Sequence, residues 1–234
     1  MKLSKYTLIA LLCGAFLVGQ TSCGSITNTG KGALIGGGSG AAAGAGIGAL
    51  IGGGKGAGIG AAIGAAVGAG AGTLIGNRMD KQQKELQQQL AEQAKVEETT
   101  DANGLRAIKI TFDGGILFAT GKSDLSPQAQ ADLTRFAQSL NANPNTDVSI
   151  YGFTDNTGSF AANERVANSR AAAVMSFLVN KGVSPTRLHA EGIPMADYVA
   201  SNDTPEGRAL NLRVEIYITA DQEMIRQAEA GTLQ

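Results

Sequence analysis

Hydrophobic and polar residues alternate along several short segments in the second half of the chain. Residues 105–112, LRAIKITF, and residues 212–219, LRVEIYIT, show the period of two that is typical of half-buried strands. Shorter strands are predicted at residues 148–153 and 188–191, and a long polar loop is predicted over residues 192–210. Four strands are therefore expected in this half of the chain.

Apolar residues between these strands recur instead every three or four positions, which predicts helices. Ser126 followed by Pro127 is a helix start, because serine caps the free N–H groups and proline fits the first turn. This helix stops before Asn143, and its apolar face carries Leu133, Phe136, Ala137 and Leu140. A second helix is predicted over residues 160–180 and a short terminal one over residues 220–230.

The order of these elements predicts an α+β fold. Two strand–helix units followed by two further strands, βαβα-ββ, give a two-layer sandwich in which helices pack on one face of a mixed sheet. The domain is expected to span residues 104–220, followed by a C-terminal helix and tail at 221–234.

The pattern in residues 32–76 is different, because glycine occupies every fourth position there without a gap. A period of four places these glycines on one stripe of a helix, and small residues let helices approach closely in lipid. Lys55 interrupts the segment after Gly52–Gly54, which predicts a hairpin of two helices, each long enough to cross a bilayer. A flexible glycine-rich linker and an oligomer joined through the glycine stripe are the alternatives.

The first residues have the pattern of an export signal. Two lysines precede an apolar run at residues 6–18, which is too short for a spanning helix. The stretch QTSC resembles a lipobox, so cleavage after residue 22 and acylation of Cys23 are expected, with residues 23–31 as a tether. The alternative is an ordinary signal peptide and a free thiol.

Residues 77–103 are predicted to be a spacer. Residues 77–96 are rich in Gln, Lys and Glu and carry a thin apolar stripe, which predicts a polar helix. Residues 97–104, EETTDANG, contain turn formers and are interpreted as the boundary of the globular domain.

Composition excludes several classes of function. A formal net charge of −1 argues against a nucleic-acid-binding surface. One histidine and two cysteines, both near the N-terminus, exclude a His/Cys metal site, and no cofactor is expected. His189 has no accompanying nucleophile motif, and nothing places Glu191 and Glu206 at the separation of a glycosidase pair, so no catalytic residue is predicted.

Asp155 and Arg170 are the candidate binding pair. Asp155 lies in a predicted turn after a strand, and Arg170 follows on the next helix. A carboxylate and a guanidinium can bind the amine and the carboxylate of one zwitterionic group, since Arg binds carboxylates in bidentate fashion. The alternative is that the two side chains simply pair with each other.

Several motifs of this half of the chain together resemble the OmpA-type C-terminal domain. They are GFTDNTG at 152–158, NERVANSRA at 163–171, V-x-x-x-L-x-x-x-G at 174–182 and NDTPEGRALNLRVEI at 202–216. With the glycine ladder and the lipobox, the chain resembles an OmpA-family lipoprotein of the YiaD type. The sequence departs from the family pattern at Phe153, Ala167, Tyr198 and Leu212.

The resemblance implies noncovalent binding of peptidoglycan, with Asp155 on the amine and Arg170 on the carboxylate of a diaminopimelate side chain. Thr154, Asn163, Asn211 and Arg213 match polar positions around this pocket. The expected protein is an outer-membrane lipoprotein, held in outer-membrane lipid, whose periplasmic domain tethers the membrane to the cell wall. The alternative is an oligomeric membrane assembly or pore built by the glycine-rich helices and positioned by the wall domain.

Overall fold

A computed structural model describes residues 69–90, 92–119 and 122–233. The predicted signal peptide, Cys23, the tether and most of the glycine ladder lie outside the described residues. In chain order the elements are α3 (Ala69–Leu90), β1 (Ala94–Thr100), β2 (Arg106–Asp113), α4 (Gly114–Leu117), α5 (Pro127–Ala142), β3 (Thr146–Phe153), α6 (Phe160–Asn180), a 3-10 turn (Pro185–Arg187), β4 (Leu188–Ile193), α7 (Pro205–Asn211), β5 (Arg213–Ala220) and α8 (Gln222–Glu229).

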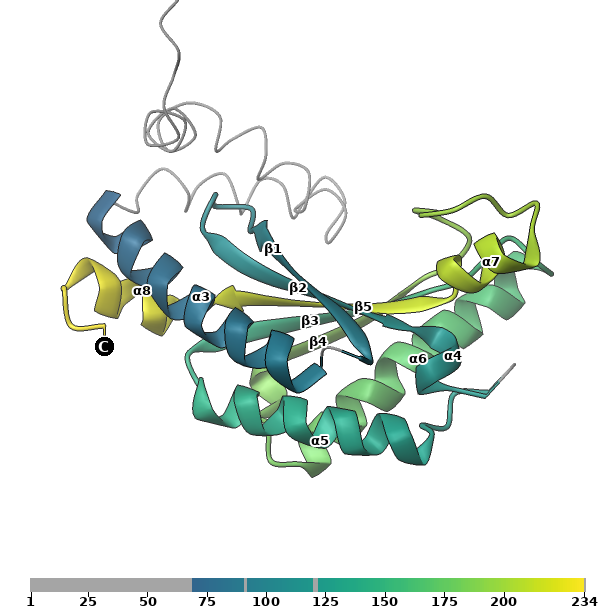
Figure 1. Cartoon of the computed structure of the whole chain (residues 1–234), viewed down its shortest axis with the longest axis horizontal. Coiled ribbons are helices and arrows are strands. Elements are labelled where there is room, and N and C mark those ends of the chain that lie inside the picture. The colour runs from purple at the N-terminus through teal and green to yellow at the C-terminus, as the bar shows by residue number, and fades with distance from the viewer. Residues whose placement is uncertain (1–68, 91, 120–121, 234) are drawn as a thin grey trace, which may run out of the picture.

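The fold is the α+β sandwich that the sequence predicts. The strands form one mixed sheet in the order β1-β2-β5-β3-β4. All neighbours are antiparallel except β3 and β4, which run parallel because α6 connects them as a crossover. Figure 1 shows α3, α5, α6 and α8 on one side of this sheet.

The core lies between the sheet and these helices. Alternate residues of the strands point into it, including Ile108 and Ile110 of β2 and Ile216 and Ile218 of β5, all fully buried. The predicted apolar face of α5 packs against them, with Leu133, Phe136 and Leu140 fully buried. The intervening strand residues, among them Arg213, Glu215 and Tyr217, therefore lie on the opposite face of the sheet.

The prediction that residues 77–103 form a spacer is wrong, because this segment is part of the domain. It contains most of α3 and all of β1, which pairs along its whole length with β2. The apolar stripe of α3 packs into the common core and consists of Ile75, Met79, Leu86 and Leu90, none of them exposed. β1 was missed because an edge strand needs few apolar residues, and only Val96 of AKVEETT is buried hydrophobic.

Three further boundaries differ from the sequence prediction. The expected hairpin ends at residue 76, but residues 69–76 already belong to α3, whose Ala71 and Ile75 are buried in the domain core. The expected polar loop contains α7, which Thr204 caps by accepting a hydrogen bond from Gly207 N at 3.1 Å. The predicted C-terminal helix is confirmed as α8, but the domain does not end at residue 220, because Met224, Ile225 and Ala228 of α8 are buried in the core.

Two glycines set how closely α6 lies against the sheet. A Cβ on Gly152 of β3 would lie 2.4 Å from the Ala167 carbonyl oxygen, and a Cβ on Gly192 of β4 would lie 2.4 Å from Asn168 N. Only glycine therefore permits this approach of helix and strands. The contact places Arg170, one turn after Ala167, near the turn that follows β3.

Candidate ligand-binding site

The turn after β3 is shaped by the polar residues that the sequence singles out. Asp155 Oδ1 accepts a hydrogen bond from Thr157 N at 2.8 Å. Asn163 Nδ2 donates to the carbonyls of Thr157 and Ser159 at 2.8 and 3.1 Å, which fastens the turn to the first turn of α6. Thr154 Oγ1 accepts from Met195 N at 3.0 Å. Three of the predicted site residues therefore hold the turn that presents the Asp155 carboxylate.

Arg170 reaches this turn from α6 and is only 4% exposed. Its Nε donates to the Lys122 carbonyl at 3.2 Å, and its guanidinium lies 5.1 Å from the centre of the Phe118 ring. Burial lowers the pKa of Arg170, while the charge of Asp155 opposes that shift. The cation is thus held in place by one backbone acceptor and one aromatic face.

Asp155 and Arg170 make no ion pair with each other among the residues that the structure describes, so the alternative of a simple structural pair does not hold. Nη1 of Arg170 is buried without a hydrogen-bond partner in this part of the chain. A buried N–H group of a cation that has no acceptor is costly, by about 1–3 kcal/mol or more. The two charged side chains therefore lie near each other, and Nη1 of Arg170 can still donate a hydrogen bond to a ligand.

Asn211 has a different environment from the one expected for a ligand contact. It is fully buried at the end of α7, where its Oδ1 accepts from Val199 N and Ala200 N at 2.8 and 3.1 Å. Its Nδ2 donates to the Ala200 carbonyl and to Asn202 Oδ1, both at 2.9 Å. Asn211 thus fastens the segment between β4 and α7, and its predicted role in binding stays a prediction.

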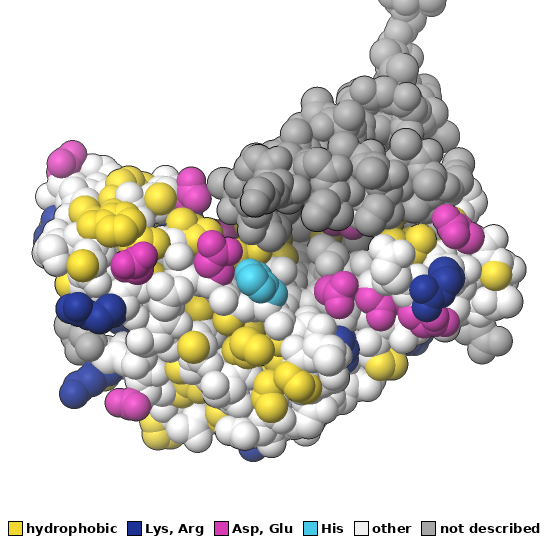
Figure 2. Space-filling model, turned by 180° about the vertical axis from the view of Figure 1, so that it is seen from behind, with side chains coloured by type: hydrophobic (Ala, Val, Ile, Leu, Met, Phe, Trp, Pro, Cys, Tyr) yellow, Lys and Arg dark blue, Asp and Glu magenta, His cyan; other side chains and the backbone are white. Residues whose placement is uncertain are grey.

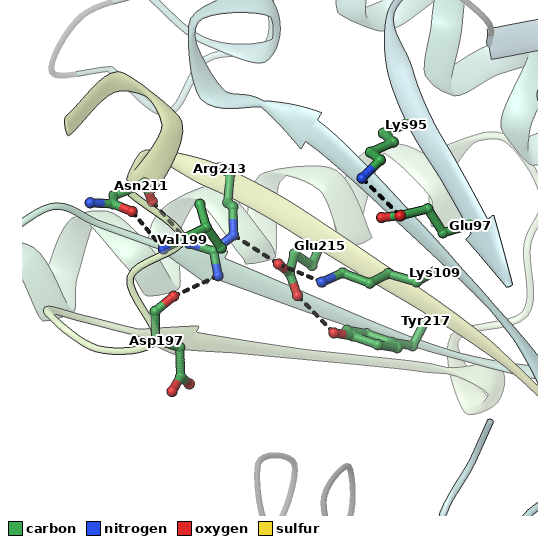
Figure 3. A network of polar contacts seen from close by, with 9 residues as sticks. All are labelled: Lys95, Glu97, Lys109, Asp197, Val199, Asn211, Arg213, Glu215 and Tyr217. Carbon is green, nitrogen blue, oxygen red and sulfur yellow. Dashed lines mark hydrogen bonds and ion pairs between the residues drawn. The ribbon is translucent and has the colours of Figure 1, made fainter. Parts of the chain in front are cut away.

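Arg213 lies on the face of the sheet opposite the helices. Its guanidinium stacks 3.9 Å from the centre of the Phe153 ring. Nε donates to Glu215 Oε1 at 2.8 Å, and Nη2 donates to the Asp197 carbonyl at 2.9 Å (Figure 3). The predicted site residues therefore form two groups, one around Asp155 and Arg170 and the other across the sheet.

The segment that joins α4 to α5 contributes to the site and was missed by sequence reasoning. It supplies Phe118 and the carbonyl of Lys122 to Arg170. Gly114 N donates to the Leu212 carbonyl at 2.8 Å, and a Cβ on Gly114 would lie 2.4 Å from that oxygen and 3.6 Å from Arg170 Nη1. A backbone carbonyl has no residue-specific signal, so only the tertiary structure locates it.

Within the described ranges, no group of three His, Cys, Asp or Glu side chains is placed to hold a metal ion. None of the helices described there combines the length and the hydropathy needed to cross a membrane.

Comparison with known proteins identifies the class of this domain. Residues 117–212 match the OmpA family model, and residues 1–80 match the model of the YMGG-like Gly-zipper. Each match covers less than half of the chain, so the likeness to the OmpA family is a likeness of the C-terminal domain. The cell wall anchor of the T6SS from Pseudomonas aeruginosa has the same fold, with a TM-score of 0.51 and 28% identity over 58% of this chain and 97% of that one.

Several curated proteins resemble this half of the chain. Outer membrane protein A of Bordetella avium is 38% identical over 117 residues, which are 50% of this chain and 60% of that protein. The probable lipoprotein YiaD of Escherichia coli is 36% identical over 48% of this chain and 51% of YiaD. The peptidoglycan-binding protein ArfA of Mycobacterium tuberculosis is 40% identical over 48% and 34%, respectively. The match thus spans 34–60% of these relatives' length.

Proposed function

We propose that this protein is an outer-membrane lipoprotein whose OmpA-like domain binds peptidoglycan and tethers the membrane to the cell wall. Asp155 accepts the amine of a diaminopimelate side chain, and Arg170 donates to its carboxylate. The observation that carries this proposal is the unpartnered Nη1 of Arg170 beside an unpaired Asp155. A zwitterionic end group satisfies both charges at once.

The relatives support the wall as the ligand. ArfA is named as a peptidoglycan-binding protein, and the matching structure is a cell wall anchor. The site consists of a buried Arg and an Asp held in a turn, and their charges interact. No nucleophile motif accompanies the two residues. We therefore infer binding without catalysis, and no cofactor is needed for it.

The membrane end of the mature protein is proposed to be residues 23–68. Residues 1–22 are the signal peptide, Cys23 carries the lipid, and the glycine zipper holds the outer membrane. The relatives named outer membrane protein A and probable lipoprotein YiaD support this location. Because many copies bind one polymer, a weak site per domain is sufficient for a tether.

The wall-binding proposal is tested by sedimentation of the full-length protein, in detergent, with purified peptidoglycan. Asp155→Asn keeps an oxygen for Thr157 N but removes the charge, and Arg170→Met keeps the stem but removes the guanidinium. Each change removes a charge-assisted hydrogen bond worth about 1.5–3 kcal/mol, so affinity falls by roughly 10-fold or more. Glu164→Gln and Arg165→Gln, which alter exposed charges of the same helix, are the matched controls and leave sedimentation unchanged.

If the Asp155→Asn and Arg170→Met variants both sediment with peptidoglycan as wild type does, the proposed site is wrong. A loss that is equal in the two control variants shows nonspecific charge attraction and contradicts it as well. Adding a free diaminopimelate-containing peptide releases the wild-type protein if the site takes the stem peptide.

A second candidate function, an oligomeric membrane assembly, is favoured by the match of residues 1–80 to the Gly-zipper model. Small residues at the interface allow close packing, so Leu at Gly44, Gly48, Gly60 and Gly64 abolishes crosslinked oligomers in membranes if this assembly forms. Crosslinking that is unchanged in this variant excludes an assembly through the glycine stripe.

A further inference from the structure

The face of the sheet opposite the helices carries a pocket that the proposed function does not use. Its volume is about 280 Å³. Tyr151 and Phe153 of β3 and Tyr217 of β5 form its floor, and Tyr198 and Val199 of the segment between β4 and α7 line it as well. Tyr198 and Val199 are 41% and 58% exposed, so they form an apolar lip at the entrance.

The charged groups of this pocket neutralise one another. Lys109 Nζ lies 2.9 Å from Glu215 Oε1, and Arg213 Nε donates a hydrogen bond to the same oxygen at 2.8 Å. Glu215 Oε2 accepts a hydrogen bond from the Tyr217 hydroxyl at 2.7 Å (Figure 3). Burial raises the pKa of Glu215, but these hydrogen bonds outweigh burial and lower it below the ordinary value. Three contacts thus occupy the Glu215 carboxylate, and the formal charges of Lys109, Arg213, Glu215 and Asp197 around the pocket sum to zero. The pocket does not call for a charged ligand.

One polar group of the pocket lacks a partner. The hydroxyl of Tyr151 is buried and makes no hydrogen bond of normal geometry within the described ranges. Burial raises the pKa of this hydroxyl, although the Ser149 side chain lies close enough to lower it by a smaller amount. The Tyr151 ring packs edge-on against Tyr217, with 5.8 Å between the ring centres. Leaving a buried hydroxyl unsatisfied costs free energy, and a ligand atom that pairs with the hydroxyl removes that cost.

Aromatic walls, a neutral polar floor and one free hydroxyl suit a ligand that has an apolar face and uncharged polar substituents. A sugar ring has both, because its axial C–H bonds stack on aromatic faces while its hydroxyl and amide groups form hydrogen bonds. The volume lies at the lower end of the range for small-molecule pockets, about 300–1,000 Å³, and suits one ring. We infer that this pocket binds an N-acetylated hexose ring of a glycan.

The pocket adjoins the proposed wall site, and the inference rests on that proposed function. Phe153 directly precedes Thr154 and Asp155, and Arg213 directly follows Leu212, whose carbonyl holds Gly114 beside Arg170. The two sites thus lie at one end of the sheet on opposite faces. Phe153 and Tyr198 are positions at which this chain departs from the OmpA-type pattern, so these walls are features of this chain.

Side-chain hydrogen bonds fix the residues on either side of Tyr198. Asn211 binds Val199 N and Ala200 N, and Arg213 binds the Asp197 carbonyl. Tyr198 therefore extends from a stretch fixed on both sides by side-chain hydrogen bonds. A preorganised lip loses less entropy on binding than a free loop.

Binding of chitotetraose, a peptide-free oligomer of N-acetylglucosamine, tests this inference. The full-length protein is titrated in a detergent without a sugar headgroup, by calorimetry and by intrinsic fluorescence. The chain has no Trp and four Tyr, and three of the four line the pocket, so tyrosine fluorescence reports on it directly. We expect saturable heat and fluorescence changes with chitotetraose, and at least 10-fold weaker binding of cellotetraose, which lacks the acetamido groups.

Conservative pairs of variants separate stacking from folding. Tyr198→Ala removes an exposed ring and weakens chitotetraose at least 5-fold, whereas Tyr198→Phe keeps the ring and stays within twofold of wild type. Tyr151→Phe removes only the hydroxyl and weakens binding at least 3-fold without lowering the melting temperature. No saturable binding of chitotetraose, or equal affinity in Tyr198→Ala, overturns the inference.

The Asp155→Asn variant distinguishes the two sites. It keeps chitotetraose affinity within twofold of wild type, while it loses sedimentation with peptidoglycan. If sedimentation depends on Asp155 and chitotetraose does not bind, the sugar pocket is refuted and the wall-binding proposal stands. If chitotetraose binds and sedimentation does not depend on Asp155, the proposed wall site fails and the sugar pocket stands.

Discussion

Leu86→Ala tests whether α3 is part of the domain or a spacer. Leu86 lies one turn before the end of α3, is fully buried, and belongs to the same core as the sheet residues. Replacing a fully buried Leu by Ala costs about 2–5 kcal/mol, because the transfer free energy is lost and a cavity remains. In an exposed spacer helix the same change costs almost nothing, since Ala has the higher helix propensity.

The expected shift in melting temperature follows from the size of the domain. For a domain of this length, 1 kcal/mol corresponds to about 2–4 °C, so Leu86→Ala lowers the melting temperature by about 4–20 °C. Far-UV circular dichroism of the fragment 69–234 measures it. Leu210→Ala is the matched control, because Leu210 is 55% exposed and its loss costs about 0.5 kcal/mol or less. Equal melting temperatures for Leu86→Ala and wild type would refute the placement of α3 in the core.

Three further predictions concern the domain boundary, the sheet face and the approach of α6. The fragment 104–234 lacks β1 and the buried apolar face of α3, so it fails to unfold cooperatively in urea, whereas 69–234 gives a single transition. The pKa of Glu215 is lower in the folded state than its usual 4.5. Its contribution to stability is therefore complete above pH 4.5 and is lost as pH falls through the folded-state pKa. Between about pH 5 and pH 3, wild type loses more stability than Glu215→Gln, as measured by urea unfolding. Gly152→Ala places a Cβ 2.4 Å from the Ala167 carbonyl oxygen and pushes α6 outward, so it lowers the melting temperature and weakens sedimentation with peptidoglycan. Gly115→Ala is the control and changes sedimentation little, because its Cβ would meet only a side-chain oxygen at 3.3 Å.

The elements with their own local signals were predictable. The predicted serine cap of α5 is confirmed, with Ser126 Oγ accepting from Ala129 N at 3.0 Å, and α6 also follows a serine, whose Oγ (Ser159) accepts from Ala162 N at 3.3 Å. In β2 and β5 the apolar residues alternate toward the core, as their period of two predicts, although β5 also buries Arg213 and Glu215 on its other face. These signals are local because capping and alternation depend on residues only a few positions apart.

The candidate site was predictable only in part. Motif spacing identified Asp155 and Arg170, and the chain folds so that their charges interact. The same motifs could not show that Arg213 points to the other face, since that depends on its pairing with Asp113 in the sheet and its stacking on the Phe153 ring. They also could not show that the Lys122 carbonyl, 48 residues away in sequence, holds Arg170.

The sequence by itself determined the class of fold and the strands and helices with strong local periods, and it proposed the acid and the base of the candidate site. The tertiary structure alone decided that α3 and β1 complete the core, that Asn211 fastens a loop, and that Tyr151, Tyr198 and Tyr217 share one pocket. The physical reason is that a weak apolar stripe or a polar edge strand gains its free energy from contacts distant in sequence. Such contacts leave no periodic pattern along the chain, so they become visible only when the sheet and its helices are assembled.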